Sequence, residues 1–244
     1  MDVYTALIGL GAALPLMWQL WHTHDERVLT YAFVIGLAAL LAGRAGYVAI
    51  HWGYFGEHRE QVFSLSNPGF SEHLVLLGAW SVGRIAWSVK RVTATPFNLL
   101  LIASATWVGI GASIGCITAG CAFGREVFWQ NGAQSVGWLL RVDWPDSLGI
   151  SNPRWPTQLF MAIWLLISWV ILIASYRWRG LSPAQLLTIW LMLFAIGDSA
   201  IQLLRADETL LFRNIRIEQY FDVILFILSL YRLIHRNTPT TPQT

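Results

Sequence analysis

The sequence predicts an all-α integral membrane protein with about seven transmembrane helices and a small extracytoplasmic head between the fourth and the fifth. Three observations lead to this fold class. Of the 244 residues, 55% are hydrophobic and only 12% are charged, against about 25% charged residues in an ordinary soluble domain. The hydrophobic residues gather in runs of about 20, the length that crosses a bilayer as a helix. Fourteen Trp residues are typical of aromatic belts at the two membrane surfaces.

The same composition excludes several classes of protein. A mean hydropathy of +0.52 is incompatible with a soluble enzyme, a disordered chain or a disulfide-stapled secreted domain. A formal net charge of +2 is too small to indicate a nucleic-acid partner. The expected partner is therefore the lipid bilayer itself.

Seven apolar runs define the expected helices, in chain order residues 3–21, 28–50, 73–89, 97–121, 157–176, 184–204 and 218–234. We expect residues 1–236 to form one transmembrane helical domain. Residues 237–244 are polar and rich in Pro and Thr, so we expect a disordered C-terminal tail.

Two of the connections are informative. Residues 122–156 form a 35-residue connection, too long for a turn, and carry Trp129, Trp138, Trp144 and Trp155. This pattern predicts the small head, anchored by indole rings on the outer membrane surface. Residues 205–217 mix charged and apolar side chains, so they form either a segment at the membrane interface or an ordinary loop.

Basic residues predict the orientation. With the N-terminus outside, the short loops on the cytoplasmic side hold seven basic residues and the much longer outer loops also hold seven. The positive-inside rule weighs short loops most, so we expect the N-terminus outside and the C-terminus in the cytoplasm of a bacterial-type inner membrane.

Three ionisable residues lie well inside apolar runs: Arg44, Arg84 and Asp198. Each costs roughly 2.5–3.5 kcal/mol at a helix centre, so such residues are candidates for a functional site. The alternative is structural, an ion pair between Asp198 and an Arg of another helix, and we predict that pair. Arg84 can instead extend towards the cytoplasmic surface. His73, at the start of the third run beside Glu72, is a candidate catalytic group or a helix cap.

The two cysteines, Cys116 and Cys121, have no zinc-binding spacing, so we expect no metal and no cofactor. They lie in a segment of small residues. That spacing fits two buried thiols, and it does not exclude a disulfide.

Several segments together resemble one family, the prolipoprotein diacylglyceryl transferases. Residues 42–48 resemble the family's GGRLGYV, and residues 113–124 resemble its signature R-I-G-N-F-x-x-G-E-x-x-G. Residues 69–73 lie where the family has GLSFHGG, which places His73 on its functional His. Residues 154–160 resemble RHPSQLY, and residues 197–205 resemble G-R-F-x-x-E-F-x-R. Gln219 matches the Gln that opens the last helix, and the set follows the family's order from about residue 37 to residue 235.

The departures from the family pattern concern charge. Ser113 replaces the signature Arg, and Asp198 replaces an Arg on the sixth helix. Uncharged or apolar residues replace further polar positions and glycines: Gln202, Trp155, Met161, Leu74 and Val75.

The resemblance implies transfer of a diacylglyceryl group from phosphatidylglycerol to the lipobox cysteine of a preprolipoprotein. It makes His73 the candidate proton acceptor and Arg205 the candidate phosphate partner. The remaining residues expected to bind substrate are Arg44, Arg125, Arg154, Gly115, Gly120, Gly124, Gln158, Gln202 and Asp198. The substitutions leave an alternative open: a diverged or non-catalytic paralogue that binds another lipid or a partner protein.

Overall fold

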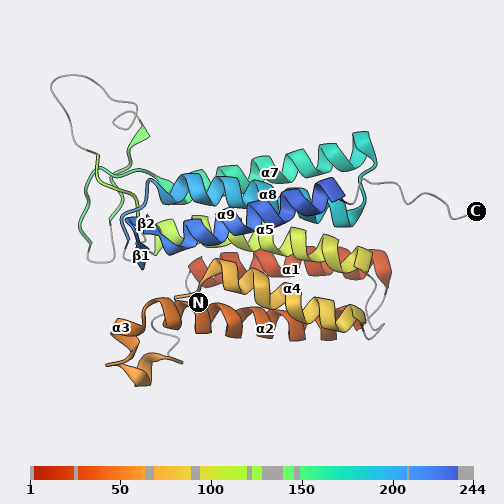
Figure 1. The fold of residues 1–244 in the computed structure, drawn as a ribbon, viewed down its shortest axis with the longest axis horizontal. Coiled ribbons are helices and arrows are strands. Elements are labelled where there is room, and N and C mark those ends of the chain that lie inside the picture. Colours follow the sequence, from red (N-terminus) through yellow and green to blue (C-terminus); the bar gives the residue numbers. More distant parts are fainter. Residues whose placement is uncertain are drawn as a thin grey trace, which may run out of the picture. The chain divides into compact units, whose positions relative to one another are not determined.

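A computed structural model describes residues 3–24, 27–63, 69–88, 94–119, 123–127, 140–145, 149–207 and 209–235. Each of the seven predicted runs forms a long helix (Figure 1): α1 (Val3–Thr23), α2 (Arg27–Ile50), α4 (Glu72–Ser88), α5 (Ala94–Thr118), α7 (Thr157–Arg179), α8 (Pro183–Gln202) and α9 (Ile217–His235). A short helix α3 (Trp52–Phe55) and a 3₁₀ turn (Arg59–Gln61) follow α2. The tail expected at 237–244 lies outside the described residues.

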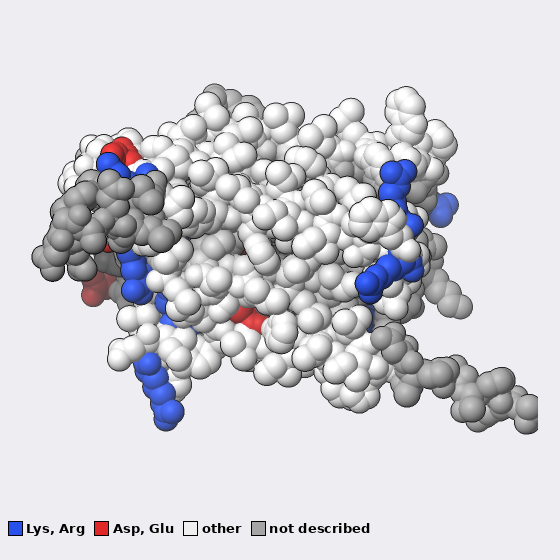
Figure 2. All heavy atoms as spheres, turned by 90° about the horizontal axis from the view of Figure 1, so that it is seen from above, with Lys and Arg blue, Asp and Glu red and all other residues white. Residues whose placement is uncertain are grey.

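Five of the helices, α1, α2, α5, α7 and α8, are long and apolar enough to cross a membrane. The fold is thus mostly helical, as predicted, while the crossings by α4 and α9 stay a prediction. On the face drawn in Figure 2, uncharged side chains cover most of the surface, as contact with lipid requires.

The described contacts divide the chain into two compact units. The first contains Met1–Ala13, Thr106–Asp207 and Glu218–Thr244, and the second contains Leu14–Ala105 and Glu208–Ile217. The prediction of one domain over residues 1–236 stays a prediction.

In the second unit, small residues allow α2 and α4 to pack closely. A Cβ added at Gly46 would overlap the Leu74 side chain, and one added at Gly78 would lie 2.8 Å from the carbonyl oxygen of Ala38. Close backbone approach at glycine is how helices gain packing contacts in lipid, where apolar surface alone gives no drive to associate. This packing fixes the first turn of α4.

In the first unit, α1 and α5 approach each other in the same way. A Cβ at Gly111 would lie 2.5 Å from the carbonyl oxygen of Leu7, and one at Gly11 would lie 2.5 Å from that of Trp107. A buried hydrogen bond of 2.9 Å, from Trp190 Nε1 to Thr106 Oγ1, joins α8 to α5.

Helices α7 and α8 form an antiparallel pair joined by a short, fully capped turn. Gly180 ends α7 in the left-handed conformation (φ 60°). Ser182 and Gln185 then form a capping box with Pro183 in the first turn of α8. Trp164 Nε1 donates to the carbonyl oxygen of Leu193 at 2.8 Å and holds the two helices together.

The connections between the long helices contain the β structure. In the head, isolated backbone bridges pair Gly124 with Arg205, and Arg154 with both Glu126 and Val142. The predicted head anchors Trp129 and Trp138 lie outside the described residues.

Within the 205–217 segment, β1 (Leu211–Phe212) and β2 (Ile215–Arg216) form a hairpin. Positive φ at both Arg213 (51°) and Asn214 (63°) indicates a type I′ turn. The side chains of Leu211 and Phe212 are 59% and 56% exposed, which favours the interfacial interpretation of this segment over an ordinary polar loop.

Candidate functional site

In the second unit, Arg44 binds the backbone of the segment that follows α2. Its Nε donates to the carbonyl oxygen of Val62 at 2.7 Å, Nη2 donates to that of Gln61 at 2.7 Å, and Nη1 donates to that of Gly69 at 3.1 Å. The guanidinium also lies over the Phe55 ring, 5.2 Å from its centroid. Through these contacts Arg44 holds the described residues that precede α4 against α2. Its predicted contact with substrate stays a prediction.

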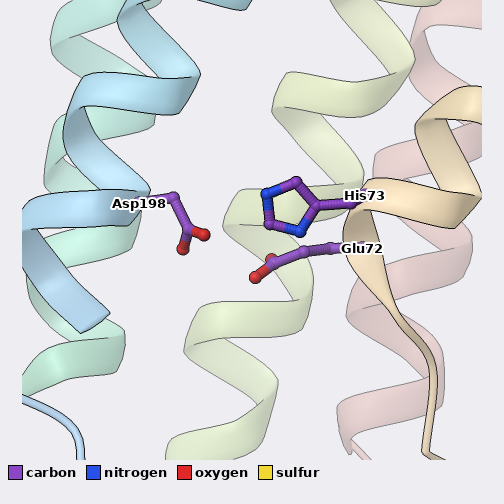
Figure 3. A group of neighbouring side chains, drawn as sticks. All are labelled: Glu72, His73 and Asp198. Carbon is purple, nitrogen blue, oxygen red and sulfur yellow. The ribbon is translucent and has the colours of Figure 1, made fainter. Parts of the chain in front are cut away.

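His73 belongs to the first turn of α4, and Figure 3 shows it leaving that turn beside Glu72. It is 8% exposed. Just before it, the Ser71 amide donates to the carbonyl oxygen of Gly43 at 2.9 Å, which ties the start of α4 to α2. The imidazole is therefore held on a rigid element, as a group that exchanges a proton with substrate requires.

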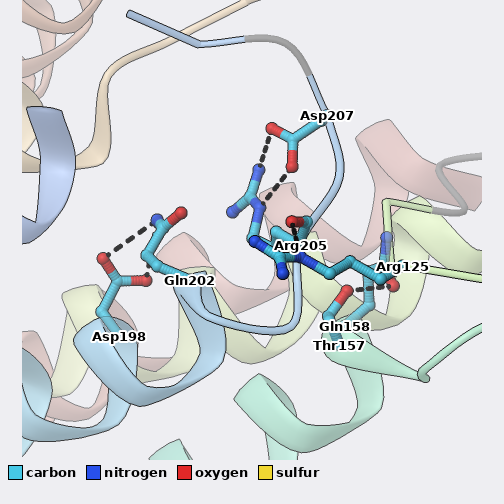
Figure 4. Close-up of polar contacts among 7 residues, drawn as sticks. All are labelled: Arg125, Thr157, Gln158, Asp198, Gln202, Arg205 and Asp207. Carbon is cyan, nitrogen blue, oxygen red and sulfur yellow. Dashed lines mark hydrogen bonds and ion pairs between the residues drawn. The ribbon is translucent and has the colours of Figure 1, made fainter. Parts of the chain in front are cut away.

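In the first unit, Asp198 and Gln202 form a buried polar pair on α8 (Figure 4). They are 0% and 1% exposed. Gln202 Nε2 donates to both carboxyl oxygens of Asp198, at 3.3 and 3.5 Å, across one helical turn. The predicted ion pair between Asp198 and an Arg of another helix stays a prediction.

Arg205, just beyond the end of α8, forms a bidentate ion pair with Asp207. Nε lies 2.8 Å from Oδ1, and Nη2 lies 2.8 Å from Oδ2. The guanidinium also stacks on Phe123, 5.3 Å from the ring centroid. Arg125 Nε donates to the carbonyl oxygen of Arg205 at 3.1 Å. Arg205 is thus fixed in place, and Asp207 binds the edge of its guanidinium group that carries Nε and Nη2.

Arg154 lies in the head beside Glu126. Its Nη2 is 3.5 Å from Glu126 Oε1, an oxygen that also accepts from Asn152 at 2.8 Å. At 38% side-chain exposure for Glu126, this ion pair is worth at most about 1 kcal/mol, so it can open for a ligand.

The other predicted binding residues fall into two groups. Gln158, at the start of α7, is buried and its Oε1 accepts from Thr157 Oγ1 at 3.1 Å. At Gly115 an added Cβ would meet Tyr4 of α1, and at Gly124 it would overlap the backbone of Trp155. Both glycines thus allow another segment of this chain to pack closely against them. Their contact with a lipid headgroup stays a prediction. Gly120 lies outside the described residues.

The structure places two further residues noted in the sequence. Arg84 is exposed on α4, its guanidinium 5.9 Å from the Trp80 ring centroid, as expected of a side chain that extends along the helix surface. Cys116, near the end of α5, is disulfide-bonded, so the second of the two cysteine interpretations holds. Cys121 lies outside the described residues.

Three polar residues of the structure were missing from the predicted set. Asp207 pairs with Arg205, Thr157 bonds to Gln158, and Asp222 of α9 is only 1% exposed. Asp222 lies inside an apolar run, so the criterion that selected Asp198 would have found it. No sequence pattern distinguishes Asp207 from an ordinary loop residue, whereas Thr157 belongs to the 154–160 motif and opens α7.

Several predicted residues therefore lie in one region of the first unit, around the head and the C-terminal end of α8: Asp198, Gln202, Arg205, Arg125, Gln158 and, in the head, Arg154. Guanidinium groups there can bind a phosphate, and buried carbonyl and carboxyl oxygens can accept from a polar headgroup. The second unit, described by itself, holds the His73 imidazole at the start of α4.

Proteins similar to this chain carry one activity in their names. The chain is 29% identical to the phosphatidylglycerol–prolipoprotein diacylglyceryl transferase of Bacillus licheniformis, over 96% of this chain and 87% of that protein. The enzyme of the same name from Bacillus velezensis is 27% identical over the same shares. That of Staphylococcus haemolyticus is 25% identical over 90% of this chain and 77% of its own length.

A model of the family described as prolipoprotein diacylglyceryl transferase matches residues 2–235, nearly the whole chain. The match includes every predicted site residue, those on both units among them. The chain belongs to the prolipoprotein diacylglyceryl transferase family.

Proposed function

We propose that this protein is a transferase of lipoprotein biosynthesis that moves a diacylglyceryl group from phosphatidylglycerol to the lipobox cysteine thiol of a prolipoprotein. The family match over residues 2–235 carries the proposal. The names of relatives 24–29% identical to this chain agree with it.

The chemistry sets what the site has to supply. The thiol sulfur attacks the glycerol carbon that carries the phosphate ester, and a carbon–sulfur bond forms while the carbon–oxygen bond breaks. Glycerol phosphate leaves with the electron pair, and the thiol proton passes to a base. The reaction needs a base near the thiol, because the thiolate is the nucleophile, and cations near the departing phosphate.

We assign the base to His73 and the phosphate contact to Arg205. An imidazole titrates near neutral pH, and His73 is buried at a helix start held against α2. A guanidinium binds phosphate through two parallel hydrogen bonds, and Arg205 is already fixed by Asp207 and Phe123. Arg125 and Arg154 add positive charge in the same unit, and Arg44 positions the segment before His73.

One observation favours a second candidate. Asp198 is completely buried at a position where the resembling motif carries an Arg, and a carboxylate repels a phosphate. A diverged paralogue that takes another lipid, or binds lipid without turnover, would explain that charge reversal.

The family and the apolar helices point to a multi-pass protein of a bacterial inner membrane. We propose seven crossings, with α4 and α9 included, the N-terminus outside and the C-terminus inside. Two features support this arrangement. The exposed side of α9 is apolar, with Val223, Ile224 and Ile227 more than half exposed. The disulfide of Cys116 belongs to an oxidising compartment, which is the side to which α5 leads.

Incubation of the purified protein with labelled phosphatidylglycerol and a lipobox peptide tests the activity. We expect a thioether product, a loss of rate of at least 100-fold in His73→Ala, and no change in His22→Ala, which alters an exposed histidine of α1. Arg205→Lys keeps the charge and loses the fork, so KM for phosphatidylglycerol should rise about tenfold. Bound lipid without product would support the paralogue, and product formed equally by His73→Ala would refute the role of His73.

Single-cysteine accessibility in intact cells tests the topology. With Cys116 and Cys121 replaced, a cysteine at position 181 should resist a membrane-impermeant maleimide, and one at position 150 should react. The opposite pattern would reverse the orientation.

A further inference from the structure

The amide of Gln202 has a fixed direction. Both carboxyl oxygens of Asp198 accept from its Nε2, so Oε1 is turned away from Asp198. In Figure 4 this oxygen points towards the side on which Arg205 and Asp207 lie. A carboxylate thus sets which end of the amide is offered to a ligand, because a carboxylate accepts hydrogen bonds and does not donate them.

That oxygen is a buried acceptor. Gln202 is 1% exposed, and among the described residues none donates to Oε1. Two other glutamines described in the first unit differ: Gln158 Oε1 accepts from Thr157 Oγ1, and Gln185 Oε1 accepts from the Ser182 amide. A buried acceptor without a donor is destabilising, so native proteins usually supply one as a water or a ligand.

Gln202 also lies at a suitable level for a headgroup. It is the last residue of α8, and the next residue, Leu203, is 60% exposed. Arg205 follows three residues later, just beyond the helix end, and Figure 4 shows it on the side to which Gln202 Oε1 points. The hydroxyls of a glycerol headgroup begin about 4 to 5 Å beyond the phosphorus, at roughly 1.5 Å a bond. A phosphate bound to Arg205 can therefore present a headgroup hydroxyl on the side to which Gln202 Oε1 points.

We infer that Gln202 Oε1, oriented by Asp198, accepts a hydrogen bond from the polar headgroup of the donor phospholipid and selects for headgroups that can donate one. The inference rests on the proposed function for the role of Arg205, and it adds the chemical class of headgroup. A glycerol hydroxyl and an ethanolamine ammonium share this donor chemistry. It also gives the buried Asp198 a use: it orients an acceptor instead of binding phosphate.

Three phospholipids with the same acyl chains test the inference: phosphatidylglycerol, phosphatidylethanolamine and phosphatidylpropanol. The headgroup of phosphatidylpropanol has no hydrogen-bond donor. We expect the wild-type protein to bind phosphatidylpropanol about 10- to 100-fold more weakly than the preferred donor lipid, a difference of about 1.4 to 2.8 kcal/mol. Whichever of phosphatidylglycerol and phosphatidylethanolamine binds more tightly shows whether a hydroxyl or an ammonium group donates the hydrogen bond. Binding is measured by titration in detergent and does not depend on turnover.

Gln202→Met keeps the shape and removes the amide. In this variant the affinities for phosphatidylpropanol and for the preferred lipid should differ by no more than about threefold, chiefly because the preferred lipid binds more weakly. Asp198→Asn should reduce the discrimination in part, because an Asn amide can donate to Oε1 and let the Gln202 amide reverse. Gln219→Met is the matched control and should keep the full discrimination, and thermal unfolding shows that each variant is folded.

Two results would overturn the inference: equal wild-type affinity for phosphatidylpropanol and the other lipids, which would mean that a water satisfies Oε1, or discrimination that survives in Gln202→Met. Neither depends on catalysis. If the headgroup preference is found and no thioether forms with any lipid, the inference stands and the proposed activity fails. If thioether forms without headgroup discrimination, the reverse holds.

Discussion

Removal of the Arg44 guanidinium should release the segment between α2 and α4. Its three hydrogen bonds reach backbone carbonyls 17, 18 and 25 residues away in the chain. Among the described residues, the remaining backbone bonds of residues 56–63 join neighbours within four residues, and the Tyr54 hydroxyl donates to Gln61 Oε1 at 2.7 Å. Local opening of this segment therefore breaks mainly the Arg44 contacts.

A hydrogen bond from a charged donor contributes about 1.5–3 kcal/mol. Three such bonds from one group are not additive, because the carbonyls can partly bind water once the guanidinium is gone, so we take about 3 kcal/mol for Arg44→Met. The free energy of local opening should fall by that amount, which is roughly a 100-fold faster amide exchange. Arg44→Lys keeps the charge but not the planar fork, so it should show an intermediate effect of about tenfold.

Hydrogen exchange followed by mass spectrometry measures this effect directly. The amides of Gln61 and Val62, bonded to His58 and Arg59, report on the segment, and the amides of the α7–α8 pair provide an internal control. Faster exchange of the reporters with an unchanged control would agree with the bracing role. Unchanged exchange at residues 56–63 in Arg44→Met would show that Arg44 does not hold this segment.

Three further predictions concern stability and cysteine chemistry. Gly111→Ala should lower stability by about 1–3 kcal/mol because its Cβ would meet the α1 backbone, whereas Gly9→Ala, with nothing within 4 Å, should not lower it; equal thermal shifts would contradict this. Thr106→Val leaves the buried Trp190 Nε1 without its acceptor and should cost about 1–3 kcal/mol in a denaturant titration, and a neutral effect would mean that another acceptor replaces it. Because Cys116 is disulfide-bonded, a maleimide should label the denatured protein only after reduction, and labelling without reductant would refute the bond.

The helices were predictable from sequence because a bilayer sets their length. Each run of about 20 apolar residues became a helix, with ends within a few residues of those predicted. Capping explains the sharpest boundary, where Gly180, Ser182 and Pro183 end one helix and begin the next. The number of crossings was less accessible, since α4 has only 17 residues and α9 carries three charged residues.

The partners of the site residues could not be predicted, for a physical reason. Intramembrane charge identified Arg44 and Asp198 as special, but the cost of a buried charge does not say which group offsets it. The structure places the Gln202 amide one turn away from Asp198, a partner that the sequence did not indicate, and the predicted ion pair stays a prediction. Arg44 binds backbone carbonyls, which every residue carries, so no side-chain pattern could have indicated them. The head bridges between Gly124 and Arg205 likewise join segments 81 positions apart.

The glycine contacts between α1 and α5 impose an order on biosynthesis. Leu7 and Gly111 meet in the finished protein, but 104 residues separate them in the chain. At about 5–20 residues per second, a ribosome delivers α5 roughly 5–20 s after α1. During that interval the glycine-bearing side of α1 lacks its α5 partner, while α2 and α4 are already made. Any mutation that speeds its capture by a wrong helix would lower the yield of protein without changing the stability of the molecules that mature.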